Sequence, residues 1–403
     1  MPYSCSRDVL DPGDPLRIFH RQQLGPMPAF LTSFPALQDV PEQHHQTWVE
    51  AVVTVLRRWS AASTEEETKN ALSWFLFIPQ ALLRRPRRGG RAGRNEVSKR
   101  FNYIVKGDWG SLIELWERDK AVQIEDKERR NRRGQGGERQ EDDLNKKRRE
   151  VISLISSGQI SRAMQRVTSH GLANMSDPAV MAQVKAKYPT SGWPLPVSVP
   201  KGQPVENLRG LRDRLKGLLP GLSPGCGGMR PEYLRVIGQE MEEEDMLLLE
   251  EFGLCYLRGD HPYWFYVIWL TVQTVGIFKN ADKKAVRPLG LCNPLLKSFH
   301  KEVVVQNITE VKAHLEPQQL GVSVAGAQKL VFSVRALLNS NHEYVCVKVD
   351  LRNAYNEQAR RATIDAFAGE QSLRHLAHFT AVTLGTVHGL ETVRIHLVRS
   401  SRG

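Results

Sequence analysis

The chain has 403 residues, of which 41% are hydrophobic and 25% charged, and it carries a formal net charge of +12. This length suffices for two or three domains of roughly 100–200 residues each. The positive charge favours polyanionic partners such as nucleic acid, or an acidic membrane surface. The five cysteines are scattered and odd in number, and none has metal-ligand spacing to another, which argues against a cysteine-based zinc site and favours an intracellular location, in nucleus or cytoplasm.

Residues 1–40 are rich in proline and have no clear hydrophobic period, so we predict a disordered leader. The opening stretch MPYSCSRDVLDPGDPL lacks a basic region followed by an apolar run, and we therefore predict no secretory signal.

Residues 41–120 are predicted to form a small helical, basic region. The stretch from Gln46 to Ser60 has one apolar face at helical spacing, made by Trp48, Val52, Val55, Leu56 and Trp59. A second helix should begin at a capping box, either Ser63 with Glu66 or Thr64 with Glu67. Its apolar residues are Leu72, Phe75 and Leu76, and Pro79 is expected to interrupt it.

A basic segment runs from Arg84 to Arg100, with eight basic residues and one acid. Its glycines and proline predict an irregular backbone whose arginines follow nucleic-acid phosphates. The candidate nucleic-acid-binding patch is Arg84, Arg85, Arg87, Arg88, Arg91 and Arg94. The alternative interpretation is a solvated linker or a localisation signal.

One short helix is expected next, within residues 101–119, with Leu112, Leu115 and Trp116 on its inner face. Residues 121–200 then form a connector: its first part is dense in charges of both signs, which predicts a disordered or exposed helical segment, and its end is marked by proline and glycine. Residues 201–403 read as a folded domain.

The uncharged stretch Pro262–Phe278 is predicted to be a buried core helix, with a membrane span as the alternative. Further on, residues 327–338 have the period of an amphipathic helix. Residues 343–350 alternate as a strand does, with Val345, Val347 and Val349 on one face and Asp350 at the end of the other. From spacing alone, Asp350 either opens a site or caps the next turn.

Four motifs resemble, in order, those of the reverse transcriptases of non-long-terminal-repeat retroelements. They are GCGGMRPEYL at 225–234, VRPLGL at 286–291, QQLGVSVAGAQ at 318–328 and VKVDLRNAYN at 347–356. The resemblance covers about Gly225 to Ala368. It implies an α+β fold whose second half is the fingers and partial palm of a right-hand polymerase, preceded by the small helical basic region.

The resemblance also implies roles for particular residues. Asp350 would be the catalytic carboxylate and a ligand of Mg²⁺ or Mn²⁺, because two-metal nucleotidyl transfer needs hard oxygen donors. Leu351, Ala354 and Tyr355 would contact the incoming deoxynucleotide, the ring of Tyr355 excluding ribose. Arg287 and Lys284 would lie near its phosphates. Gln319 and Gly321 would contact the template side.

The resemblance implies RNA-templated DNA synthesis, with an RNA template and a DNA primer as partners. The family also has an Asp-Asp hairpin about a hundred residues beyond the first aspartate, and after Ala368 the chain has only Glu370 and Glu391 as acids. We therefore expect an incomplete chain that is inactive alone. The alternatives are a non-catalytic nucleic-acid-binding protein derived from a retroelement and a membrane-associated protein using residues 262–278; no clear membrane association is expected.

Overall fold

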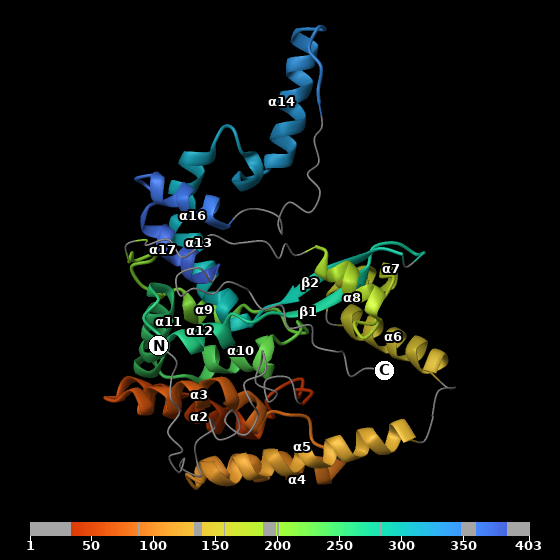
Figure 1. Ribbon diagram of the computed structural model, residues 1–403, viewed down its shortest axis with the longest axis vertical. Helices are drawn as coiled ribbons and strands as arrows, with labels where there is room; N and C mark the ends of the chain where they lie inside the picture. Colours follow the sequence, from red (N-terminus) through yellow and green to blue (C-terminus); the bar gives the residue numbers. More distant parts are fainter. Residues whose placement is uncertain are drawn as a thin grey trace.

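A computed structural model describes residues 34–87, 89–132, 139–156, 158–187, 199, 201–282, 284–347 and 360–384. These residues are mostly helical and contain one two-stranded sheet (Figure 1). The arrangement is compatible with the predicted α+β class. Most of the predicted leader, residues 1–33, lies outside the described residues.

The first two helices confirm the predicted helical region. They are α2 (His45–Ser60) and α3 (Glu65–Leu82). Thr64 Oγ1 accepts a hydrogen bond from Glu67 N at 3.2 Å, and the Glu67 carboxylate accepts one from Thr64 N at 3.0 Å, so this pair forms the capping box. The predicted interruption at Pro79 is wrong. Every residue of α3 from Ala71 onward is buried, and this packing outweighs the roughly 3 kcal/mol that an interior proline costs.

The next two helices correct the prediction of an irregular basic segment. Helix α4 (Gly90–Val105) is followed by α5 (Trp109–Arg132), with the break at Gly107, whose φ is +69°. The single short helix expected within residues 101–119 is therefore two helices. The inner face of α5 holds Leu112 and Trp116 as predicted, together with Ile113, whereas Leu115 is only half-buried.

The main core joins these helices to the second half of the chain. Trp48 Nε1 donates to Tyr233 O at 3.1 Å, and the rings of Trp59 and Phe252 meet edge to face at 5.2 Å. We call this unit the helical body. Its later helices are α9 (Leu211–Lys216), α10 (Pro231–Glu240), α11 (Glu243–Arg258), α12 (Tyr263–Trp269), α13 (Pro294–Leu315), α16 (Arg360–Gly369) and α17 (His375–Thr383).

A smaller unit, the hairpin lobe, consists of a β-hairpin and the short helix packed on it, with a helix pair beside them (Figure 1). It comprises α6 (Arg139–Ser156), α7 (Ile160–Thr168), α8 (Pro178–Lys185), β1 (Gln273–Phe278) and β2 (Val286–Leu291). The strands are antiparallel, from Gln273↔Leu291 to Phe278↔Val286. A separate apolar cluster of Ala173, Met175, Val180, Val184 and Val286 holds the unit together. The described part of the charged connector is thus mostly helical, with a non-helical stretch at residues 169–177.

The apolar stretch Pro262–Phe278 is not the single buried helix that its composition predicts. Helix α12 ends at Trp269, and the chain continues as β1 from Gln273 because the β-branched and glycine-containing end pairs with β2. Among the described helices, none combines the length and the apolar character needed to cross a bilayer.

Helix α14 (Gly326–Ser340) confirms the predicted amphipathic helix, but it projects away from the helical body (Figure 1). Its apolar side chains Leu330, Val331, Phe332 and Leu337 are all more than half exposed. The strand predicted from Glu343 is absent over the described residues 343–347, where Val345 and Val347 are exposed, because no described strand pairs with this segment.

Candidate nucleic-acid interface

Several residues with predicted roles cannot be placed. The structure describes neither the candidate metal ligand nor the residues expected around the nucleotide, and it omits one arginine of the basic patch: Asp350, Leu351, Ala354, Tyr355 and Arg88. Their roles remain predictions. The remaining candidates lie on the β-hairpin, on the loop before α14 and around α4.

The β-hairpin places Lys284 and Arg287 at its end. Lys279 N donates to Ala285 O at 2.8 Å, which closes the turn, and Asp282 Oδ1 accepts from Lys284 N at 3.2 Å. Val286 is buried, so the next residue, Arg287, points to the opposite, exposed face of β2. The hairpin therefore keeps its apolar residue inside and its basic residues outside.

Helix α8 fixes the hairpin from one side. Asp177 caps α8 by accepting from Ala179 N at 2.8 Å, and Pro178 is its first residue. Gln183 then holds the hairpin backbone with both ends of its amide: Nε2 donates to Lys284 O and Oε1 accepts from Val286 N, each at 3.2 Å. Because side-chain hydrogen bonds hold the backbone on either side of Ala285, the turn residues are well positioned to present their side chains.

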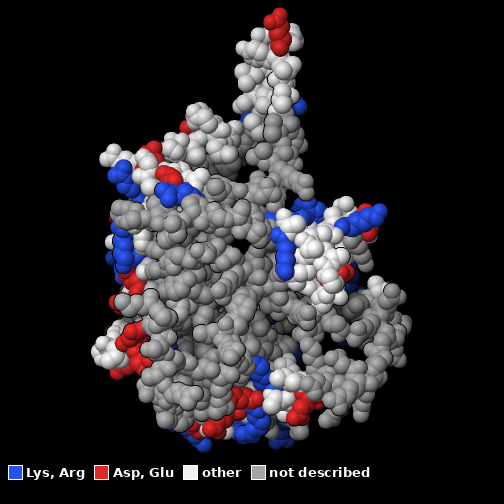
Figure 2. Space-filling view, in the orientation of Figure 1, with Lys and Arg blue, Asp and Glu red and all other residues white. Residues whose placement is uncertain are grey.

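The basic residues carried by the hairpin and by α8, which packs on β2, form what we call the hairpin cluster: Lys185, Lys279, Lys284 and Arg287. All four are exposed, and none forms an ion pair with any residue that the structure describes. Figure 2 shows Lys and Arg side chains gathered where α8 meets the hairpin. A rigid support with unpaired cations can bind a polyanion, with Arg287 able to contact a phosphate in bidentate fashion.

Sequence reasoning found half of this cluster. Lys185 was not predicted, because it lies in the charged connector about a hundred residues before Lys284. Only the packing of α8 on β2 brings these two segments of the chain together. One available signal was the Asp-Pro start of α8, which predicts a helix with Lys185 in its last turn. Lys279 lies ahead of the VRPLGL motif in the sequence, but no role was predicted for it.

The predicted template loop lies apart from the hairpin cluster. Gln319 Oε1 accepts from Gly321 N at 2.7 Å and thereby shapes a tight turn between α13 and α14. In Figure 1 this turn is well separated from the hairpin end. The structure therefore brings Lys284 and Arg287 together, and Gln319 and Gly321 together, as two separate sites.

The basic patch divides into structural and exposed arginines. The prediction that Arg84 contacts a phosphate is wrong, because its side chain is 1% exposed and its Nε and Nη2 donate to Asp119 Oδ2 at 3.0 and 2.6 Å. Arg100 is also buried and donates to the Arg84 carbonyl and to Glu96. Burial lowers the pKa of Arg100 to about 10, so it remains charged at neutral pH.

The other described arginines of the patch face solvent. Arg85, Arg91 and Arg94 are exposed, and Arg87 forms an ion pair with Asp126 at 3.5 Å. These residues remain available for an anion, although on a regular helix from Gly90 onward and not on the irregular backbone that was predicted.

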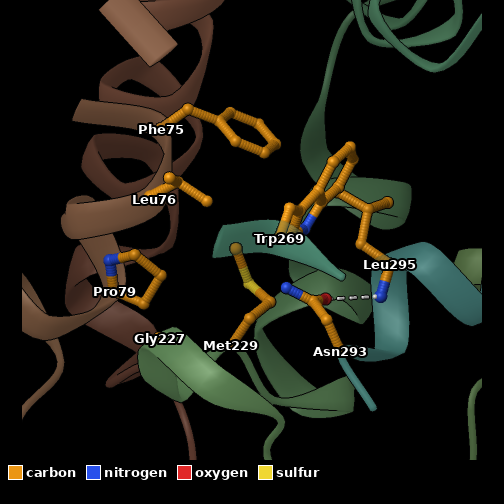
Figure 3. A pocket seen from close by; sticks show the side chains of 8 residues that line it. All are labelled: Phe75, Leu76, Pro79, Gly227, Met229, Trp269, Asn293 and Leu295. Atoms are coloured by element: carbon orange, nitrogen blue, oxygen red, sulfur yellow. Dashed lines mark hydrogen bonds between the residues drawn. The ribbon is translucent and has the colours of Figure 1, made fainter. Parts of the chain in front are cut away.

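Neither of two hollows in the helical body suits a nucleotide. The apolar pocket beneath the glycine turn, lined by Phe75, Met229, Trp269 and Asn293, has about 10 Å³ of free space, room for one water molecule (Figure 3). Asn293 is turned toward α13, where its Oδ1 accepts from Leu295 N at 2.9 Å. A larger hollow between α2 and α11 is lined by acids, including Glu50 and Asp245, and would repel phosphate.

Within the described ranges, no three His, Cys, Asp or Glu side chains are grouped so that they could hold a metal ion. Comparison with protein-family models, with curated proteins and with solved structures gave no match for this chain.

Proposed function

We propose that this chain binds nucleic acid as the fingers and the beginning of the palm of a reverse transcriptase-like protein. The observation that supports this best is the hairpin cluster: Lys284 and Arg287, assigned to the fingers by resemblance, are exposed on a braced hairpin that also carries Lys279, and α8, which packs on β2, carries Lys185. The order of the four sequence motifs supports the family, and the net charge of +12 supports a polyanionic partner.

In this proposal the template is RNA and the primer is DNA. Asp350 would hold Mg²⁺ or Mn²⁺, Leu351, Ala354 and Tyr355 would contact the deoxynucleotide, and the bound metal would stabilise the charge that develops during phosphoryl transfer. Carboxylate oxygen suits such an ion. The two-metal reaction needs further carboxylates near the metal ions. Among the described residues, no three His, Cys, Asp or Glu side chains are grouped so that they could supply them.

Binding of an RNA–DNA hybrid at increasing salt tests the proposal. The logarithm of the binding constant falls with the logarithm of the salt concentration, and each phosphate contact contributes about 0.9 to the steepness of this fall. Fluorescence anisotropy should therefore show a fall that is less steep by about 1.8 for Lys284→Gln/Arg287→Gln than for wild type. The matched control is Lys297→Gln/Lys301→Gln, which removes the same charge from the exposed side of α13. Equal slopes for the two variants would exclude the hairpin cluster as the interface.

Primer extension with Mg²⁺ separates a polymerase from a nucleic-acid-binding protein without catalysis. Because Asp350 is the single candidate ligand, we expect no measurable extension by this chain alone. If extension does occur and Asp350→Ala leaves its rate unchanged, then Asp350 is not the metal ligand.

A further inference from the structure

Helix α4 presents a second set of basic residues that the hairpin cluster does not include. Its inner side is buried through Gly93, Val97, Arg100 and Phe101. The residues on the opposite side recur at spacings of three and four, as one face of a helix requires, and all of them are exposed. We call this set the α4 face: Arg91, Arg94, Asn95, Lys99 and Asn102.

The α4 face carries no acid. The one acidic residue of α4, Glu96, is turned toward Arg100, which donates to its carboxylate, and it also accepts from Arg87 N at 3.3 Å. Arg91, Arg94 and Lys99 form no ion pair with a described residue, while Lys99 lies 5.8 Å from the centre of the Tyr103 ring. Their charges are therefore free for an external anion.

The buried arginines attach the helix that carries this face to its neighbours. Arg100, one turn from Glu96 on the inner side, donates to the carbonyl of Arg84, and Arg84 binds Asp119 of α5. Together these contacts attach α4 to the end of α3 and to α5. Cations on a backbone that is already fixed lose less backbone freedom on binding than cations on a flexible tail.

The donors on this face suit a duplex backbone better than a single strand. Arginine, lysine and asparagine are common phosphate-contacting residues, and from Arg91 to Asn102 they extend over about 16 Å of helix, a length that corresponds to roughly five base-pair steps of 3.4 Å along a duplex axis. Single-stranded binding relies on exposed aromatic side chains that stack on bases; none of the five residues of the α4 face is aromatic, and Tyr103, beside Lys99, is half-buried.

We propose that the α4 face binds the phosphate backbone of a nucleic-acid duplex, at a site separate from the hairpin cluster. In Figure 1 α4 lies along the edge of the helical body far from the hairpin end, and Figure 2 shows Lys and Arg side chains at this edge. The inference goes beyond the proposed function, because it assigns a second contact surface, separate from the hairpin cluster.

The test is binding of a short blunt DNA duplex by the full chain, followed by anisotropy across a salt series. For the variant Arg91→Gln/Arg94→Gln/Lys99→Gln, the fall of log affinity with log salt should be less steep by about 2.7. Between 50 and 200 mM salt, the affinity of wild type should therefore fall about 40-fold more than the affinity of the variant. The matched control, Lys301→Gln/Lys329→Gln/Arg335→Gln, removes the same charge from exposed positions elsewhere and should retain the wild-type slope.

Two further measurements make the result decisive. Circular dichroism should show the same melting temperature for wild type and the α4 variant, since all three substituted residues are exposed. The α4 substitutions should weaken the binding of a single strand of equal length much less than the binding of the duplex. Equal losses of affinity for the two ligands would overturn the assignment to a duplex. On the RNA–DNA hybrid, no loss in Lys284→Gln/Arg287→Gln would contradict the proposed fingers, and a loss of duplex binding in the α4 variant would still support this inference. Identical slopes for the α4 variant and its control would overturn the inference.

Discussion

In the helical body Arg84 and Arg100 are buried and bonded, whereas in the hairpin lobe Lys284 and Arg287 are exposed and unpaired with described residues. The two regions look alike in the sequence, since each combines several basic residues with glycine and proline. The fold separates them: the buried charges of Arg84 and Arg100 hold helices together, and the exposed charges of Lys284 and Arg287 remain available to a ligand. Substitution of the buried pair should therefore change stability, and substitution of the exposed pair should change affinity.

The largest expected effect is on the stability of the body. Arg84→Ala should lower the free energy of unfolding by about 3–5 kcal/mol, because it leaves Asp119 buried without its partner and removes donors from the end of α3. Urea unfolding followed by circular dichroism measures this. Arg85→Ala, one residue along and exposed, should change stability by less than about 0.5 kcal/mol. Equal losses of stability for Arg84→Ala and Arg85→Ala would contradict a structural role for the buried arginine.

Acid should destabilise the body through its histidines. Burial lowers the pKa of His261 and of His300 to about 4, below their ordinary value of 6.5. The unfolded chain therefore takes up these protons first, and stability should fall as the pH drops from 6.5 to 4, by about 3 kcal/mol for His261. Urea unfolding at several pH values checks this, and His300→Gln should flatten the curve. A pH-independent midpoint over this range would contradict the burial of these rings.

The smallest effect is expected on α14. Leu337 is 56% exposed, so Leu337→Ser should change the free energy of unfolding by less than about 0.5 kcal/mol. Leu112→Ala, at a fully buried position of α5, should cost about 2–5 kcal/mol. The same urea titration compares them. A large loss for Leu337→Ser would show that the α14 apolar face is covered in solution.

Hydrophobic period and capping chemistry predicted helices well where both agreed. Thr64 with Glu67 marked one possible start of α3, and this capping box is present in the structure. The helix interruption predicted at Pro79 was wrong, because α3 is buried on nearly all sides there. Tertiary packing outweighed the local tendency of proline to end a helix. The stretch Pro262–Phe278 misled because its second half pairs with β2, a partner that local composition does not reveal.

The candidate site was predictable only in part. Lys284 and Arg287 were found from a motif, while Lys185 joins them through the packing of α8 on the hairpin, a contact between segments a hundred residues apart. Arg84 was misassigned because counting arginines does not show which of them faces Asp119. The exposed Val345 and Val347 show the same limit, since alternation predicts a strand but does not supply its neighbour.

The most direct test of the account is to map which lysines a bound RNA–DNA hybrid protects. The chain is acetylated briefly with and without the hybrid, and the extent of modification is read by mass spectrometry. Lys185, Lys279 and Lys284 should be modified several-fold more slowly in the complex, while Lys297 and Lys301 on α13 should be unaffected. Equal protection of both sets, or protection of α13 alone, would contradict the assignment of the hairpin lobe to nucleic-acid binding.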